Sequence, residues 1–139
     1  MTVMRTAAMA AAAWFLGATV ASAAIVAKVD LGEQQMQIYV DGTLRYTWSI
    51  ASGRGGFETP TGSYRPQRLE REWYSKQYDD AAMPYSVFFS GGYAIHGGYS
   101  RVGRPASHGC IRLQTANAAK FFDLVASHGA GSTRIVITN

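Results

Sequence analysis

Alternating apolar and polar residues mark the segment that follows position 33. Met36, Ile38 and Val40 alternate with glutamines and a tyrosine across 34–40, which is the period of a strand with one buried face. Asp41-Gly42 is a residue pair that two-residue hairpin turns prefer. We therefore predict a β-hairpin with one buried side, whose returning strand turns inward Leu44, Tyr46, Trp48 and Ile50.

Shorter strand-like stretches occur along the rest of the chain. Pro66 would restrict one of them to a sheet edge, because proline cannot donate a hydrogen bond to the ladder. Glycine and proline mark 52–62 and 102–109 as loops. The further strands that we predict are 25–30, 63–69, 85–90, 93–96 and 134–138.

One segment near the C-terminus has the period of a helix instead. Thr115 is a candidate N-cap, and His128 with Gly129 would end the helix. The apolar stripe of this helix is Ala118, Phe121, Phe122 and Val125. The chain is thus predicted to be mainly β, a β-sandwich-like or open-barrel domain with one main helix near the C-terminus.

The first 23 residues differ from the rest in composition. A basic start ending at Arg5 precedes an apolar run over 6–20, and small residues follow at 21–23. That order is typical of a secretory signal peptide. The alternative, a membrane anchor, needs a run of about 20 apolar residues, so we expect cleavage and no stable anchor. Residues 24–139 would then form one domain, which we expect to be monomeric.

Charge and cysteine content narrow the function classes. The net charge is +4, or +3 without residues 1–23, which suits an anionic polymer such as a bacterial wall. Nucleic acid is a poor alternative for an exported chain without a basic run. Cys110 is the only cysteine, so no internal disulfide can form. A lone thiol in an oxidising compartment is buried and inert, paired with another chain, or kept for chemistry.

The residues around the cysteine favour chemistry. His108 lies two positions before Cys110, and His96 lies fourteen before it. An imidazole that takes the thiol proton makes cysteine an effective nucleophile. Gly109 lets the backbone approach a substrate, so the N–H groups of Gly109 and Cys110 could form an oxyanion hole. Arg112 would share a face with the thiol and suits a substrate carboxylate. A zinc site is the rival interpretation, but these spacings match no common zinc pattern.

Two short strings together resemble the signature of a known family. Residues 95–97 read IHG and 107–113 read SHGCIRL, which is similar to the L,D-transpeptidase (YkuD-type) catalytic domain. The ETPTG string at 58–62, the segment at 83–89 and the opening hairpin also resemble that family. The resemblance covers essentially all of 24–139 and implies a β-sandwich-like domain with a helix.

The resemblance also implies catalytic roles. Cys110 would be the nucleophile, and His96 would be the general base, oriented by the backbone carbonyl of Gly97. His108 would shape the pocket around the thiol, while Gly109 and Cys110 would supply oxyanion donors. No metal or organic cofactor would be needed.

Substrate contacts are expected from other residues. In the family's pattern Arg112 would bind the donor stem peptide, and Ser107 would act as a structural hydrogen-bonder beside it. Of the aromatic residues that could line a cleft, we expect Tyr85 and the Trp73-Tyr74 loop to lie nearest the substrate. The other aromatic candidates are Trp48 and Tyr78.

The implied reaction is acyl transfer on peptidoglycan. Cys110 would form a thioester with a tetrapeptide stem, release D-alanine, and pass the acyl group to an amine in a 3→3 cross-link. Water as acceptor would make the same site an L,D-carboxypeptidase, and a non-catalytic wall-binding module is the alternative from another class. The expected location is periplasmic or cell-wall-associated.

Overall fold

The computed structural model describes residues 23–98 and 101–139. The predicted signal peptide lies outside the described residues except for Ala23. Within the described ranges, no helix is long and apolar enough to cross a membrane.

Strands dominate the domain, as predicted. The long ones are β1 (Ile25–Asp30), β2 (Gln35–Val40), β3 (Thr43–Ser49), β8 (Ser86–Ser90), β9 (Tyr93–His96) and β11 (Thr133–Thr138). The short ones are β4 (Gly62–Tyr64), β5 (Arg68–Glu70), β6 (Tyr74–Ser75), β7 (Ala81–Ala82) and β10 (Ile111–Arg112). The helices are α1 (Thr115–His128) and the short 3-10 helix η1 (Ala130–Ser132).

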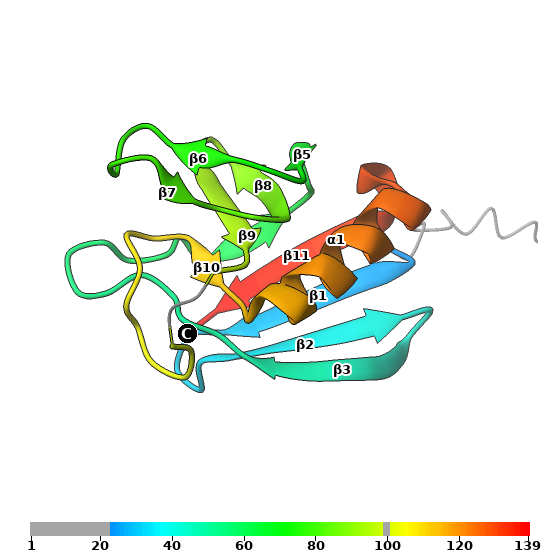
Figure 1. Ribbon diagram of the computed structural model, residues 1–139. Helices are drawn as coiled ribbons and strands as arrows, with labels where there is room; N and C mark the ends of the chain where they lie inside the picture. The colour runs from blue at the N-terminus through cyan, green and yellow to red at the C-terminus, as the bar shows by residue number, and fades with distance from the viewer. Residues whose placement is uncertain (1–22, 99–100) are drawn as a thin grey trace, which may run out of the picture.

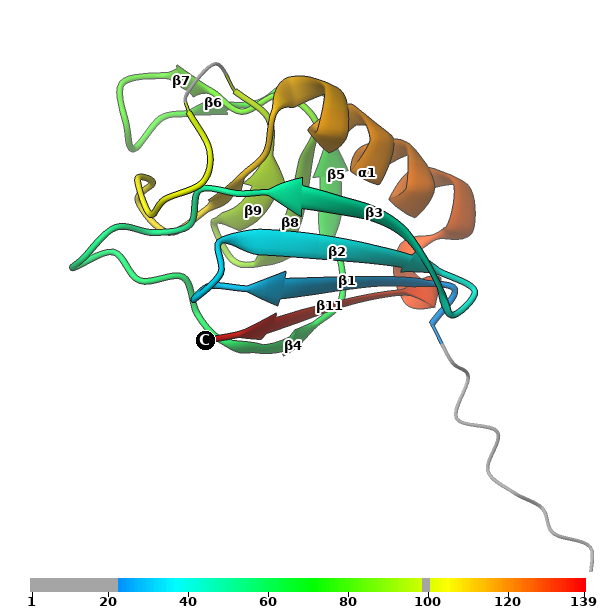
Figure 2. The same cartoon turned by 90° about the horizontal axis from the view of Figure 1, so that it is seen from below.

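Two sheets and α1 enclose the core. One sheet has the order β3-β2-β1-β11-β4, and the second has the order β10-β9-β8-β5. Figures 1 and 2 show α1 and the second sheet on the same side of the first. The inner faces of β1 and β11 and the predicted stripe of α1 pack into one buried cluster. The mainly β fold with one main helix is therefore confirmed.

Pro66 separates two short strands, β4 and β5, where the sequence pattern predicted one. The prediction of one strand over 63–69 is wrong: β4 pairs with β11 in the first sheet, whereas β5 pairs with β8 in the second. Pro66 is buried between them. Because its fixed ring and missing N–H interrupt the ladder, the chain crosses from one sheet to the other at this point.

Three smaller expectations also fail. Leu44 lies at the outer end of the hairpin and is 46% exposed, so the inward face is limited to the half of β3 nearer the core. Thr115 is the first helical residue, and the N-cap is Gln114, which makes no side-chain cap bond. Gln34 has a φ of 51° and lies before β2 rather than in it.

The segment after β3 links the first sheet to the second through backbone hydrogen bonds. Ala51 and Arg112 exchange backbone hydrogen bonds of 2.9 Å each, and Ser52 O accepts the N–H groups of Ala106 and Ser107. The Gln34 side chain fixes this strip by accepting from Ser52 N at 3.0 Å and donating to Ser52 Oγ at 2.6 Å. The loop that contains the cysteine is thus anchored to the core.

Candidate active site

A cleft of about 310 Å³ lies beside the end of β10. One wall comes from β9, β10 and the loop before β10, and the opposite wall from β6, β7 and the turn between them. The cleft gathers five of the residues singled out from the sequence, which are His96, Ser107, His108, Cys110 and Arg112. It brings in residues of the β6–β7 hairpin as well, among them Tyr78 and Met83.

Strand pairing explains why the histidine and the cysteine meet. β9 and β10 run parallel, and Arg112 pairs with His96. Paired residues of adjacent strands point to the same face, and so do residues two apart along a strand. Arg112 therefore faces the same side as His96, and Cys110, in the bend just before β10, lines the same cleft.

His96 is held as a neutral imidazole. Its side chain is buried, and Nδ1 donates a hydrogen bond of 2.6 Å to the Gly97 carbonyl oxygen. Burial lowers the pKa of His96 to about 4; the Gly97 carbonyl opposes this shift, and the Arg112 charge adds to it. With the proton on Nδ1, Nε2 keeps its lone pair. The ring is thus a proton acceptor that stays uncharged at neutral pH.

The position of Gly97 fixes that orientation. Gly97 N donates to Pro84 O at 2.8 Å. A Cβ at this position would lie 2.9 Å from the Cα of Thr115 and 3.2 Å from the Cβ of Ala118, so the start of α1 leaves room only for glycine. The start of the helix thereby fixes the position of the Gly97 carbonyl group, which orients His96.

Cys110 rests as a thiol. Burial raises its pKa, and the Ala94 backbone N–H and the Arg112 charge both oppose that shift. Among the described residues, the hydrogen bond of Sγ goes to the Gly92 carbonyl oxygen, at 3.8 Å, rather than to the imidazole. A thiol of raised pKa is a weak nucleophile, so this one needs a base and a turn of its side chain toward His96.

The turn before Cys110 is closed by Ser107. Its Oγ accepts a 3.0 Å hydrogen bond from Gly109 N and donates to Cys110 O. Through these two hydrogen bonds Ser107 has a structural role in the turn. The Gly109 N–H already has a partner, however, so of the two expected oxyanion donors only the Cys110 N–H has no hydrogen-bond partner among the residues that the structure describes.

His108 belongs to a cluster at the rim of the cleft. Its exposed ring stacks on Tyr78, with centroids 3.9 Å apart and planes 3° apart. The Arg54 guanidinium lies 3.2 Å from His108 Nε2 and can only donate there, so Nδ1 carries the ring proton. Phe57 meets the same ring edge-on at 5.0 Å. His108 thus joins the 53–57 loop to the β6–β7 hairpin.

Tyr85 does not reach this cleft. Its backbone has a φ of 54°, and its ring packs edge-on against Phe122 of α1, with centroids 5.8 Å apart. Trp73 packs on Phe88 at 5.6 Å, and the exposed Tyr74 is not among the lining residues either. The tyrosines that line the cleft are Tyr78 and Tyr93, so the preference for Tyr85 and the Trp73-Tyr74 loop as the aromatic residues nearest the substrate is corrected.

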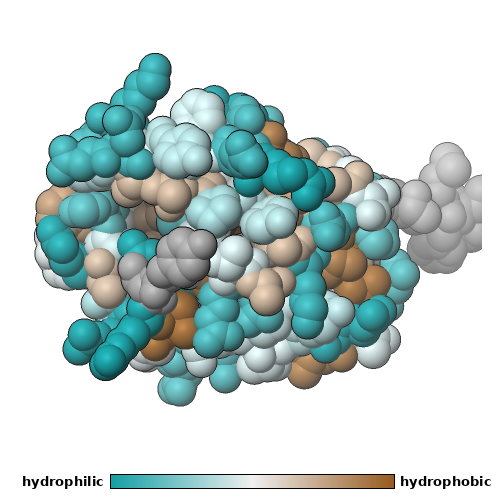
Figure 3. Space-filling model, in the orientation of Figure 1, coloured by the Kyte–Doolittle hydropathy of each residue, from teal (hydrophilic) through white to brown (hydrophobic). Residues whose placement is uncertain are grey.

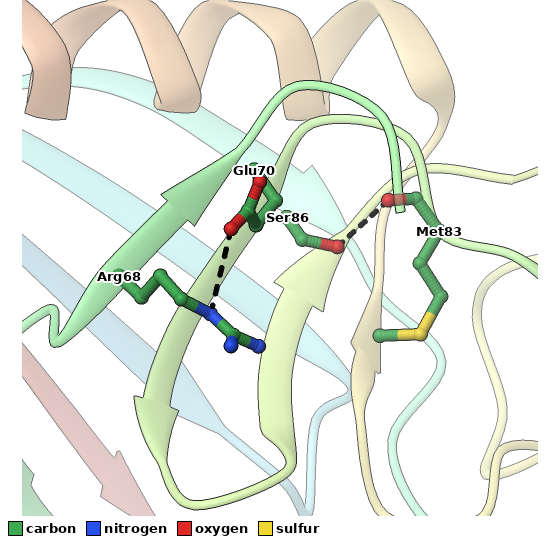
Figure 4. A network of polar contacts seen from close by, with 4 residues as sticks. All are labelled: Arg68, Glu70, Met83 and Ser86. Atoms are coloured by element: carbon green, nitrogen blue, oxygen red, sulfur yellow. Dashed lines mark hydrogen bonds and ion pairs between the residues drawn. The ribbon is translucent and has the colours of Figure 1, made fainter. Parts of the chain in front are cut away.

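Met83 connects the hairpin to the wall beneath it. Its carbonyl oxygen accepts a 2.7 Å hydrogen bond from Ser86 Oγ, and Arg68 pairs with Glu70 on the neighbouring β5 at 3.8 Å (Figure 4). The side chain of Met83 packs with Phe88 and Ala94, and Cys110 lies against this small cluster. The floor under the thiol is therefore apolar.

The cleft holds polar and ionisable groups on its inner side. Hydrophilic residues cover the outside of the β6–β7 hairpin at the upper left of Figure 3. The inner side offers a thiol, a neutral imidazole and the guanidinium of Arg112.

Among the described residues, no group of three or more His, Cys, Asp or Glu side chains could hold a metal ion. The groups present suit nucleophilic attack on a carbonyl carbon, with a cation for a nearby carboxylate.

Comparisons with known proteins agree with this geometry. The family model of the L,D-transpeptidase catalytic domain (YkuD) matches residues 24–137. An L,D-transpeptidase structure from Xylanimonas cellulosilytica is 28% identical with a TM-score of 0.73, covering 84% of this chain and 61% of that one. An L,D-transpeptidase from Mycobacterium smegmatis is 20% identical with a TM-score of 0.74, covering 84% and 59%.

A third similar structure is L,D-transpeptidase 3 from Mycobacterium tuberculosis. It is 20% identical with a TM-score of 0.72, and the match covers 84% of this chain and 61% of that one. This chain thus spans about three fifths of the length of these structures. No curated protein gives a significant match.

Proposed function

The chain belongs to the L,D-transpeptidase catalytic domain family, and from this premise we propose that it is a cysteine acyltransferase of peptidoglycan stem peptides. The observation that carries the proposal is the neutral His96, oriented by Gly97 and facing the same cleft as Cys110 and Arg112. Those groups can activate a thiol and place an anionic peptide beside it.

The first step forms a thioester. The Cys110 side chain turns toward His96, and Nε2 takes the thiol proton as Sγ attacks the carbonyl carbon of the third stem residue. The Cys110 N–H stabilises the oxyanion. The C–N bond then breaks, and the leaving amine of D-alanine takes the proton back from His96.

The second step resolves the thioester. An amine of another stem peptide attacks the acyl carbon while His96 Nε2 takes its proton; the C–S bond breaks, the proton passes to the departing Cys110 sulfur, and a 3→3 cross-link results. Arg112, half-buried beside the thiol, would hold a carboxylate of the donor stem. His108 and Ser107 support the cleft through the contacts described above and take no proton in either step.

The proposal includes the cellular setting. Residues 1–23 would be a secretory signal peptide and 24–139 the catalytic domain, acting in the periplasm or cell wall. The family's substrate supports export, because peptidoglycan lies outside the cytoplasmic membrane.

A β-lactam provides the first test. The M. tuberculosis structure holds a faropenem-derived adduct. We expect intact-protein mass spectrometry to show one adduct per chain after incubation with a penem or carbapenem, and none with Cys110→Ala. Purified stem peptides should then give cross-linked dimers. Free tripeptide stems alone would indicate the hydrolase instead, and an unreactive thiol with retained binding to sacculi would indicate a wall-binding module.

A further inference from the structure

A buried hydroxyl lies directly behind the cysteine loop. Thr59 is 4% exposed and belongs to the loop between β3 and β4. Its Oγ1 donates a 2.7 Å hydrogen bond to Gly109 O and accepts a 2.9 Å hydrogen bond from Gly53 N. The hydroxyl is thus fixed on both sides, and its donated bond ends on the peptide group that joins Gly109 to Cys110.

Because that peptide group is planar, the direction of its C=O also fixes the direction of its N–H. In a trans peptide the C=O and the following N–H point in opposite directions. With Gly109 O directed at the buried Thr59, the Cys110 N–H is directed away from Thr59. Among the described residues, no hydrogen bond occupies the Cys110 N–H.

The surrounding backbone is packed too closely to relax. A Cβ on Gly53 would lie 1.8 Å from Phe57 O, and one on Gly109 would lie 2.5 Å from the ring of Tyr93. Gly109 also has a φ of +123°, a conformation that side chains disfavour. The backbone of the loop therefore has little room to shift, and the Thr59 hydroxyl holds it from the buried side.

From this geometry we propose that Thr59 is a positioning residue of the acyl-transfer step, which sets the Cys110 N–H to receive the oxyanion. The inference rests on the proposed function in that it assumes acyl chemistry at Cys110. Thr59 itself touches no substrate, since it is buried outside the cleft lining.

Two reagents separate this role from a structural one. With p-nitrophenyl acetate, the thiolate forms a C–S bond, the carbonyl oxygen becomes an oxyanion, and p-nitrophenolate leaves as the C–O bond breaks. The thiol proton goes to His96 Nε2. With iodoacetamide, the thiolate displaces iodide at a saturated carbon and no oxyanion forms. The ratio of the two rates reports the oxyanion donor alone.

The test compares Thr59→Val, which keeps the side-chain shape, with Thr59→Ser, which keeps the hydroxyl. We expect Thr59→Val to slow acylation by on the order of tenfold and to change alkylation by less than about twofold, because only acylation uses the oxyanion donor. Thr59→Ser should restore the ratio. Equal slowing of both reactions, no slowing of either, or a Thr59→Ser ratio as low as that of Thr59→Val would overturn the proposal.

The wild-type protein supplies a second measurement in case Thr59→Val does not fold. Amide hydrogen exchange followed by NMR should show the Gly109 N–H protected by Ser107 and the Cys110 N–H exchanging fast. The reverse order would contradict the proposal. Neither measurement needs peptidoglycan, so a chain that rejects stem peptides and carbapenems would disprove the proposed function while the role of Thr59 is still decided.

Discussion

The two walls of the cleft are built differently. The wall of β9 and β10 contains the buried run from Ala94 to Gly97, which is joined to β10 by strand pairing and backed by α1. The opposite wall, the β6–β7 hairpin, has strands of two residues each, and most of its residues from 74 to 82 are exposed. Its aromatic contact with the rest of the rim is the stack of Tyr78 on His108.

This difference separates two tasks. In the proposed reaction, the groups that exchange a proton and form a bond lie on the wall with the most constraints, because acyl transfer requires atoms held to within a fraction of an ångström. The hairpin would contact parts of the substrate far from the reacting carbon, where change is better tolerated. Substitutions on the first wall should therefore alter rates, and those on the hairpin should alter substrate affinity.

The largest effect is expected from His96→Gln. Glutamine has a similar size but accepts no proton at neutral pH, and burial raises the pKa of Cys110, so thioester formation should fall by roughly 10²- to 10⁴-fold. Stopped-flow or mass-spectrometric acylation rates measure this. The matched control is His128→Gln on the exposed end of α1, which should react as the wild type does. A His96→Gln rate within about threefold of the wild-type rate would refute the base assignment.

The same histidine should make stability depend on pH. Its pKa falls from 6.5 to about 4 on folding, so the unfolded chain binds more protons between these values. The free energy of unfolding therefore decreases as the pH drops from 6.5 to 4, by roughly 3 kcal/mol from this group. Urea unfolding at several pH values should show a steeper acid loss for wild type than for His96→Gln. Parallel curves for the two proteins would contradict the burial of an uncharged imidazole.

The sequence could predict much of the first sheet and of α1. Its period-two and period-3.6 patterns place the strands of the first sheet and the stripe of α1, since burial there follows the alternation directly. His96, Cys110 and Arg112 could be singled out because glycines and histidines gather around one thiol. Their alignment across parallel β9 and β10 follows only from the fold.

The hairpin wall could not be predicted in the same way. Tyr78 is followed by Asp79 and Asp80, which both have a φ of 53° where the hairpin turns back, and neither residue signals such a turn as strongly as Asn-Gly does. The contact between Arg54 and His108 joins residues 54 positions apart. Tyr85 is an aromatic residue of the type that often lines a cleft, but its backbone conformation places the ring against Phe122 of α1.

Gly97→Ala should show how closely the buried wall is fitted. The added methyl would lie 2.9 Å from Thr115 Cα, so the carbonyl that orients His96 must move. We expect a loss of about 1–3 kcal/mol in unfolding free energy, as for other overpacked sites, and slower acylation. Gly98→Ala is the control, because its methyl would meet only the flexible Arg112 side chain at 3.5 Å. Equal losses in both variants would show that the contact with α1 is not responsible.

The smallest effect is expected from the hairpin. Tyr78→Ala removes the ring that stacks on His108, but the residues that form the thioester keep their contacts. We therefore expect KM for stem peptides to rise by several-fold, on the order of the 0.5–1.5 kcal/mol that an aromatic pair contributes, while the iodoacetamide rate stays unchanged. Tyr74→Ala, 56% exposed on the same hairpin, is the control and should leave both values unchanged. If Tyr78→Ala lowered kcat and the alkylation rate together, the hairpin would be part of the reacting wall, and the division between the two walls would be wrong.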